Sequence, residues 1–181
     1  MREDTRTRIQ EIALRLFTEQ GYEATSLREI AEELGVTKAA LYYHFRTKDD
    51  IIASLVEMRM TELEELLTWF RSRPNTLQTR RELLERYAET LKRSRYLDVA
   101  KFLERNQTAM RDHPQLTRMR ETMMTLTREM SDPGATPTER ISRSMALFAL
   151  HAGKWLTLET ELSDEEIDKA TMEVAMRLLE P

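Results

Sequence analysis

Three side chains near the start of the chain have the chemistry needed to read a nucleic acid: Lys38, Tyr42 and Tyr43. A lysine can donate to guanine O6 or N7 in the major groove, and a tyrosine hydroxyl suits a phosphate or a base edge. All three fall in one short predicted helix, in which Leu41 and Phe45 are four residues apart and share another side. The pattern predicts a helix with one side in the core and one side free for a DNA groove.

The residues before this helix predict a second helix, joined to it by a tight turn. Ser26 and Glu29 have the three-residue spacing of a capping box, which marks a helix start. Gly35 suits the left-handed position that ends a helix, and Thr37 can cap the helix that follows. The range 26–45 is therefore predicted to form a helix-turn-helix, in which the first helix supports the second in the groove.

The local charge and the tyrosines favour a DNA-binding role over a purely structural one. Between Leu34 and Lys48 the charged residues are Lys38, Arg46 and Lys48, all positive. Two amphipathic helices with a glycine turn occur in many helical proteins, and a few basic residues usually form only a solvated face. Two tyrosines that compete with neighbouring apolar residues for the core side are better explained if a partner covers them.

The range from Ala24 to Ile52, ATSLREIAEELGVTKAALYYHFRTKDDII, resembles the N-terminal DNA-binding domain of the tetracycline-repressor (TetR) family of bacterial transcriptional regulators. The match is long and without gaps, but it covers only the N-terminal part of the chain. The resemblance implies a homodimer that binds double-stranded DNA at a palindromic operator. It also implies a second domain that binds a small-molecule effector, and repression as the usual outcome.

The same resemblance assigns roles within the motif. It implies groove-facing positions at Lys38, Ala39, Tyr42 and Tyr43, whereas Lys48 is among the expected phosphate contacts. The side chains fit this division, because base contacts set sequence preference and backbone contacts set register and salt dependence. The DNA-binding residues that we expect are Thr25, Ser26, Arg28, Thr37, Lys38, Ala39, Tyr42, Tyr43, His44 and Lys48.

The composition sets limits on partners and on metal chemistry. A net charge of −4 and a pI of about 5.6 show no overall basic excess. Local sign matters more than the total, and acidic residues such as Glu165 and Glu166 can face away from DNA. The absence of cysteine excludes disulfides and thiolate metal sites. The three histidines, His44, His113 and His151, show no metal-ligand spacing.

Enzymatic and membrane functions find little support in the sequence. It contains no Ser–His–acid, Cys–His or metal constellation and no glycine-rich phosphate loop, so we expect no catalytic residue, no metal and no cofactor. No apolar run approaches the ~18 residues that span a membrane, and the N-terminus lacks the apolar core of a signal peptide. We therefore expect a cytoplasmic protein without a membrane partner. A helical adaptor that binds a protein, or an all-helical enzyme, remains the alternative.

Apolar periodicity and helix caps predict an all-α protein of about nine helices. Residues 1–50 are expected to form a three-helix DNA-binding domain, and residues 51–181 a helical ligand-binding and dimerisation domain. Besides the two helices of the motif, the pattern predicts helices at 5–20, 48–73, 76–93, 96–103 or 96–110, 115–130, about 136–160, and one beginning at Ser163.

The predicted helix at 136–160 is apolar on more than one side, which indicates burial on more than one side. Gly153, near Ala149 and Ala152, would allow a close helix–helix approach. We expect this helix and the last one to pair with their copies in a second subunit. The alternative is that it is simply the central helix of a monomer.

The effector pocket is predicted from aromatic, polar and methionine side chains in the second domain. Methionine suits an adaptable pocket, although at helical spacing it is more often a core residue. His151 is likewise more often a satisfied buried histidine than a ligand contact. The predicted pocket residues are Trp69, Phe102, Asn106, Met123, Phe148, His151 and Trp155.

Overall fold

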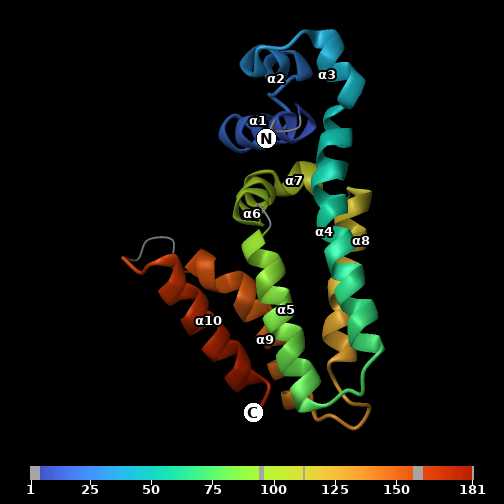
Figure 1. Cartoon of the computed structure of the whole chain (residues 1–181), viewed down its shortest axis with the longest axis vertical. Coiled ribbons are helices and arrows are strands. Elements are labelled where there is room, and N and C mark those ends of the chain that lie inside the picture. The colour runs from blue at the N-terminus through green and yellow to red at the C-terminus, as the bar shows by residue number, and fades with distance from the viewer. Residues whose placement is uncertain (1–4, 94–95, 112, 157–160, 181) are drawn as a thin grey trace. The chain divides into compact units, whose positions relative to one another are not determined.

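The described part of the protein is all-helical, as predicted. The computed structural model describes residues 5–93, 96–111, 113–156 and 161–180, and these ranges contain helices and loops but no strand (Figure 1). The helices are α1 (Thr5–Glu19), α2 (Leu27–Leu34), α3 (Lys38–His44), α4 (Lys48–Arg71), α5 (Leu77–Arg93), α6 (Tyr96–Arg105), α7 (Gln107–Met110), α8 (Pro114–Glu129), α9 (Pro137–Leu156) and α10 (Asp164–Leu178).

The chain divides into two compact units. The first comprises Met1–Met60 and Arg95–Met119, and the second comprises Thr61–Ser94 and Arg120–Pro181. Helices α4 and α8 contribute residues to both. The functional domains expected at 1–50 and 51–181 remain a prediction, because a compact unit defined by packing need not coincide with a functional domain.

The helix-turn-helix forms through the caps that the sequence predicts. The Ser26 hydroxyl accepts from the backbone N–H of Glu29 at 3.2 Å, and the Glu29 carboxylate accepts from the backbone N–H of Ser26 at 2.7 Å. Gly35 ends α2 with φ of +72°, a conformation that a side chain would strain. The Thr37 hydroxyl accepts from Ala40 N at 3.2 Å and starts α3.

The core of the first unit fixes α3 on α1 and α2. The apolar stripe of α1 is buried, including Ile9 and Phe17, and it packs with Ile30 of α2 and with Leu41 and Phe45 at the α3 end. Helix α6 also packs along α1. The motif is therefore held by helices from two distant parts of the sequence.

One predicted helix is interrupted. A helix was expected from Tyr96, with its continuation to Met110 left open, and the structure has α6 and α7 with a break at Asn106. Asn106 forms no side-chain cap there, because its amide is hydrogen-bonded to α1 and to the loop that follows α1. Helical periodicity carries no information about such a tertiary contact. With this break, the described ranges hold ten helices rather than about nine.

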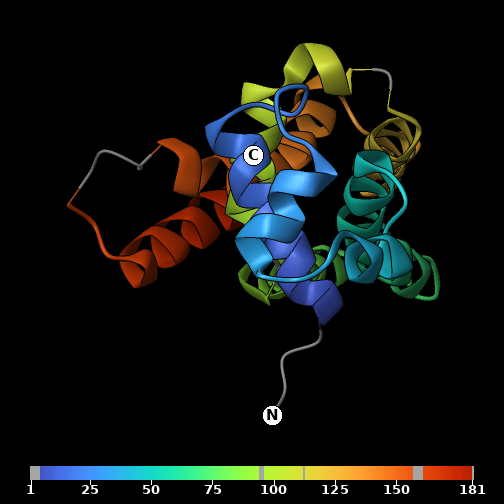
Figure 2. The same ribbon diagram turned by 90° about the horizontal axis from the view of Figure 1, so that it is seen from above.

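In the second unit, α9 divides its apolar residues between two faces. One face is buried within the chain, including Leu147 and Leu150. The other leaves Ile141, Met145 and Phe148 exposed at 65%, 43% and 57%. Helix α10 lies alongside α9 in both views (Figure 1, Figure 2). The expected second apolar side of this helix is therefore present and uncovered in the single chain.

Gly153 allows the close approach of α9 and α10 within one chain. A Cβ atom at this position would lie 2.1 Å from Oγ1 and 2.7 Å from Cγ2 of Thr171. The Thr171 hydroxyl donates to the carbonyl of Ile167 at 2.6 Å, so this side chain is held against its own helix. The two helices would have to separate to admit a methyl group.

We therefore expect Gly153→Ala to lower the free energy of unfolding, although alanine favours a helix by ~1 kcal/mol over glycine. Steric overlap in a packed contact costs ~1–3 kcal/mol, so the net loss should be roughly 1–2 kcal/mol in urea denaturation. Gly134→Ala is the matched control, because a Cβ atom at Gly134 meets nothing within 4 Å. Equal stability of the two variants would show that α9 and α10 are not packed this closely.

Candidate nucleic-acid interface

Helix α3 has one buried side and one exposed side. Leu41 and Phe45 are 0% and 2% exposed and anchor it in the core, whereas Tyr42 and Tyr43 are 41% and 87% exposed. Lys38 is exposed as well, and its ammonium lies 5.3 Å from the centroid of the Tyr42 ring. This arrangement gives a rigid rod with one cationic and two phenolic groups on its open side.

The neighbouring motif residues extend this open side. Ala39 is exposed between Lys38 and Tyr42, and its methyl group offers apolar contact only, such as contact with a thymine methyl. The His44 ring packs edge-on against the Tyr43 ring with centroids 5.3 Å apart. Tyr43 and the adjacent Tyr42 are both exposed, and exposed apolar groups that occur together on a surface indicate a site that a partner covers.

Four further residues that we expect at the DNA, Thr25, Ser26, Arg28 and Thr37, differ in whether their polar groups are exposed and in which bonds they already form. Thr37 is exposed, and its hydroxyl oxygen caps α3. The Ser26 hydroxyl donates to Glu29 at 2.8 Å, and exposed Arg28 donates to Glu32 at 2.7 Å. Thr25 is 1% exposed, and its hydroxyl donates to the carbonyl of Gly21 at 2.9 Å.

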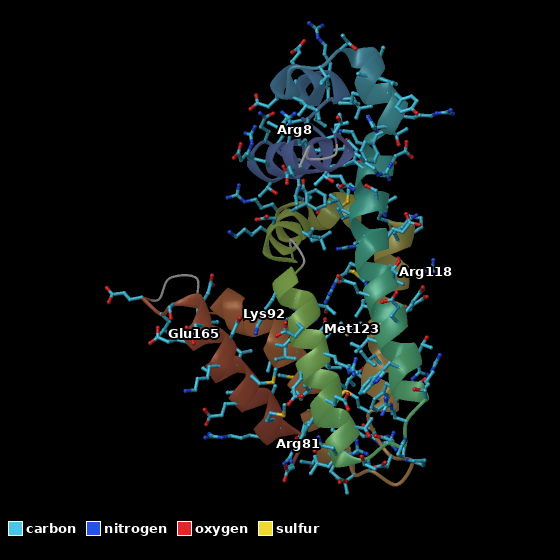
Figure 3. The ribbon with its side chains drawn as sticks, viewed as in Figure 1. Arg8, Arg81, Lys92, Arg118, Met123 and Glu165 are labelled. Atoms are coloured by element: carbon cyan, nitrogen blue, oxygen red, sulfur yellow. The ribbon has the colours of Figure 1, made fainter. Side chains whose placement is uncertain are left out.

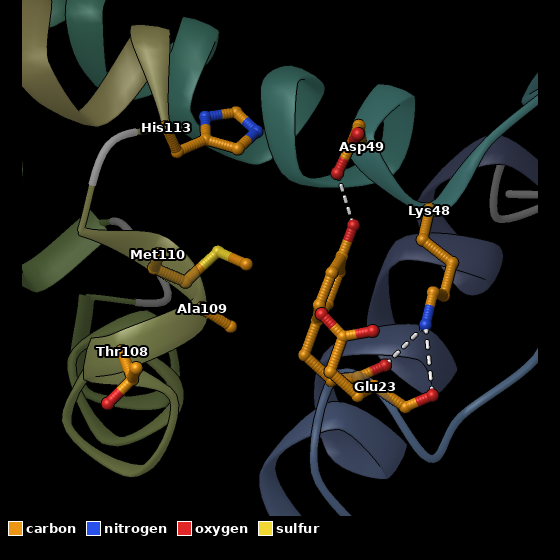
Figure 4. A pocket seen from close by; sticks show the side chains of 8 residues that line it. Glu23, Lys48, Asp49, Thr108, Ala109, Met110 and His113 are labelled. Carbon is orange, nitrogen blue, oxygen red and sulfur yellow. Dashed lines mark hydrogen bonds between the residues drawn. The ribbon is translucent and has the colours of Figure 1, made fainter.

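Lys48 lies at the start of α4 beside the loop that follows α1. Its ammonium donates to the carbonyls of Tyr22 at 2.5 Å and Glu23 at 3.4 Å, and it lies 4.4 Å from the centroid of the Tyr22 ring. The Tyr22 hydroxyl donates to Asp49 (Figure 4). Burial, reinforced by that hydrogen bond, raises the pKa of Tyr22 above its ordinary value, so the phenol stays protonated at neutral pH.

Tyr22, Glu23 and Asp49 were not predicted as site residues. Tyr22 and Glu23 lie about 25 positions before Lys48, and no spacing rule joins them to it. The one local signal is that Asp49 directly follows Lys48 at a helix start. These residues line a cavity of about 490 Å³ in the first unit, whose other side is formed by α7 and by His113 (Figure 4).

The seven predicted pocket residues are divided between the two compact units. Phe102 and Asn106 are buried in the first unit, whereas the other five belong to the second. None of the six whose side chains the structure describes lines the 490 Å³ cavity or a second cavity of about 350 Å³ between α1 and α6. The effector pocket therefore remains a prediction.

The predicted pocket residues of the second unit lie in different environments. The Trp69 ring is covered by the guanidinium of Arg86, 4.4 Å from its centroid. Met123 lies half-buried on α8 (Figure 3), and His151 is hydrogen-bonded to the hydroxyl of Tyr87. Phe148 is on the exposed face of α9, and the side chain of Trp155 lies outside the described part of the structure.

The described residues include neither a cluster of metal-binding side chains nor a membrane-spanning helix. Within those ranges, no group of three or more histidine, cysteine, aspartate or glutamate side chains is arranged to hold a metal ion. Within the same ranges, every helix is too short or too polar to cross a membrane.

Comparison with known sequences places the motif in a large group of regulators. Residues 9–55 match the family model described as bacterial regulatory proteins, tetR family. The chain is 44% identical over 64 residues to the HTH-type transcriptional regulator AcrR of Shigella flexneri. This match spans 35% of the present chain and 30% of that regulator's length, so it concerns the N-terminal part of both proteins.

Comparison with solved structures extends over nearly the whole chain. AmtR of Mycobacterium smegmatis superposes with a TM-score of 0.76 and 27% identity, over 98% of this chain and 87% of that one. AibR, solved in complex with isovaleryl coenzyme A and operator DNA, gives a TM-score of 0.56 over 93% of this chain and 96% of that one. At 23% identity, the second likeness shows the fold alone.

Proposed function

Because the chain belongs to the TetR family of bacterial regulatory proteins, we propose that it is a transcriptional repressor that a small-molecule effector releases from its operator. The observation that carries this proposal is the open side of α3. Lys38, Tyr42 and Tyr43 are exposed on a helix that Leu41 and Phe45 fix in the core. A protein that reads DNA needs this combination of a fixed helix and uncovered donor groups.

The active species in this proposal is a homodimer formed through α9 and α10. Helix α10 packs on α9 and also carries an exposed apolar side chain, Val174, which is 49% exposed. A single short helix reads too few base pairs for specificity. A two-fold dimer places two such helices ~34–36 Å apart, one turn of the duplex, and therefore selects a palindromic site.

The effector is proposed to bind in the second unit. An effector shifts the equilibrium only if it binds one conformation more tightly than the other. The fold is shared with AibR, which was solved with isovaleryl coenzyme A, so acyl coenzyme A esters belong in the first screen. A regulator of bacterial transcription acts on the chromosome, which places the protein in the cytoplasm.

The proposal is tested by selecting bound fragments from random double-stranded DNA with the purified full-length chain. We expect the recovered fragments to share a palindrome with half-sites one duplex turn apart. Affinity for this palindrome should fall by about 10³-fold or more between 50 mM and 200 mM salt if several phosphates are contacted. Recovery of no common sequence, together with salt-independent binding, would reject DNA recognition and favour a protein-binding adaptor.

Lys38→Ala and Lys48→Ala should separate base reading from phosphate contact. Loss of Lys38 removes a donor to a base edge, so we expect the preference at one position of each half-site to weaken by about 1–3 kcal/mol. Loss of Lys48 should lower the affinity for the selected palindrome and for random DNA by similar factors, because phosphates carry no sequence information. Binding titrations with the palindrome, with its single-position variants and with random DNA measure the effects of both substitutions. Identical effects on all three DNAs would contradict the roles proposed.

A further inference from the structure

Asn106 connects the break between α6 and α7 to the end of α1. The side chain is buried, with the residue 8% exposed, and its amide nitrogen donates to the carbonyls of Phe17 at 3.1 Å and Phe102 at 2.9 Å. Its amide oxygen accepts from the backbone N–H of Tyr22 at 2.8 Å. A buried amide with three partners holds its neighbours in one geometry, so Asn106 fixes where Tyr22 lies.

Tyr22 in turn holds the ammonium of Lys48. The Tyr22 carbonyl accepts from this ammonium at 2.5 Å, and the adjacent carbonyl of Glu23 lies 3.4 Å from the same nitrogen. A lysine ammonium has three donors. With two of them directed at carbonyls, one is left for a DNA phosphate, in a direction that the carbonyls determine.

A cavity, and not packed side chains, lies between Lys48 and α7. The cavity of about 490 Å³ separates Lys48 and Asp49 from Thr108, Ala109 and Met110 (Figure 4). The hydrogen bonds through Asn106 and Tyr22 therefore provide a defined connection from the α6–α7 break to Lys48.

We propose that Asn106 is a positioning residue for DNA binding, acting through Tyr22 on Lys48. The inference rests on the proposed function, because it takes Lys48 as a phosphate contact. This positioning role differs from the role of effector-pocket residue that the sequence led us to expect for Asn106. A displacement of the α6–α7 break moves the Tyr22 backbone, and with it the ammonium that faces the phosphate.

The test is a double-mutant cycle of Asn106→Ala and Lys48→Ala, read out as affinity for the selected palindrome over a range of salt concentrations. We expect Asn106→Ala to lower affinity about tenfold when Lys48 is present, and less than about twofold when Lys48 is already alanine. It should also reduce the salt slope by about 2, since each of two protomers loses one phosphate contact. Equal losses in both backgrounds would overturn the proposal and leave Asn106 with a structural role only.

Arg105→Ala is the matched control. Arg105 is the neighbouring residue of α6, and its guanidinium donates to the carbonyl of Thr18 at 3.0 Å. It thus ties the same two helices together without contacting Tyr22 or Lys48. We expect its effect on affinity to be the same whether residue 48 is lysine or alanine. Coupling to Lys48 as strong as that of Asn106 would show that helix packing, and not the Asn106–Tyr22 bond, is responsible.

A measurement on the unsubstituted protein covers the case in which Asn106→Ala does not fold. The ¹⁵N signal of the Lys48 ammonium, assigned by its loss in Lys48→Ala, should show slower hydrogen exchange than the ammonium of exposed Lys38. Exchange as fast as that of Lys38 would overturn the linkage. If exchange is slow but Lys48→Ala leaves the salt slope unchanged, the linkage stands and the proposed phosphate contact fails.

Discussion

Phe148→Asp is expected to convert the protein from a dimer to a monomer and to lower operator affinity by about 10²–10⁴-fold, the factor gained when two binding modules are joined. Phe148 is 57% exposed in the single chain and shares the exposed face of α9 with Ile141 and Met145. A carboxylate at the centre of an apolar dimer contact would be buried without a partner. Sedimentation velocity measures the association, and titration with the selected palindrome measures the affinity.

The control for this experiment is Met124→Asp. Met124 is 63% exposed on α8, so it has similar exposure and receives the same charge, but it lies outside α9 and α10. We expect this variant to remain a dimer and to keep its operator affinity. If Phe148→Asp also remains a dimer at micromolar concentration, the exposed face of α9 is not the subunit interface.

The local parts of the fold could be predicted because each depends on a few neighbouring residues. The capping pairs Ser26–Glu29 and Ser163–Glu166 both form as their spacing predicts. Gly35 adopts the left-handed conformation at the end of α2. These features are set by hydrogen bonds within one turn of helix, which a sequence displays directly.

The parts that could not be predicted depend on contacts between distant residues. Asn106 and Tyr22 are 84 positions apart. Helical periodicity does not predict that the Asn106 side chain will accept a hydrogen bond from the backbone N–H of Tyr22. The close approach at Gly153 was expected, but its partner is Thr171 of the same chain. The α3 surface was easier to predict, because the competition between tyrosines and apolar residues for one helix side is a local property.

Asp132, in the loop between α8 and α9, pairs with two buried arginines, one from α5 and one from α9. Arg80 and Arg143 are both 5% exposed, and both reach the same oxygen of Asp132, at 2.6 Å and 3.3 Å. Arg80 also donates to the side chain of Asn75 at 2.7 Å, and Arg143 lies 3.4 Å from Glu139. One carboxylate is therefore the shared counter-charge of two guanidinium groups that water hardly reaches.

We expect Asp132→Asn to lower the free energy of unfolding by roughly 3 kcal/mol. Removing one partner of a buried ion pair typically costs ~3–5 kcal/mol, because the remaining charge is left uncompensated. The low end applies because the Asp132 side chain is itself 46% exposed. Urea denaturation at pH 7 measures the loss. Glu129→Gln is the control, since it breaks a bridge to Arg71, which is 55% exposed, and such surface bridges contribute ~0–1 kcal/mol.

The pH dependence of this loss identifies its cause. The hydrogen bond from Arg80, opposed in part by burial and helped by the charge of both arginines, lowers the pKa of Asp132 below its ordinary value. Its contribution is therefore complete above the unfolded-state pKa of ~3.9 and is lost as pH falls through the lower folded-state value. The stability difference between the unsubstituted protein and Asp132→Asn should thus be constant from pH 7 to about 5 and shrink at lower pH. A difference that persists unchanged down to pH 2 would show that the shape of the side chain, and not its charge, holds Arg80 and Arg143.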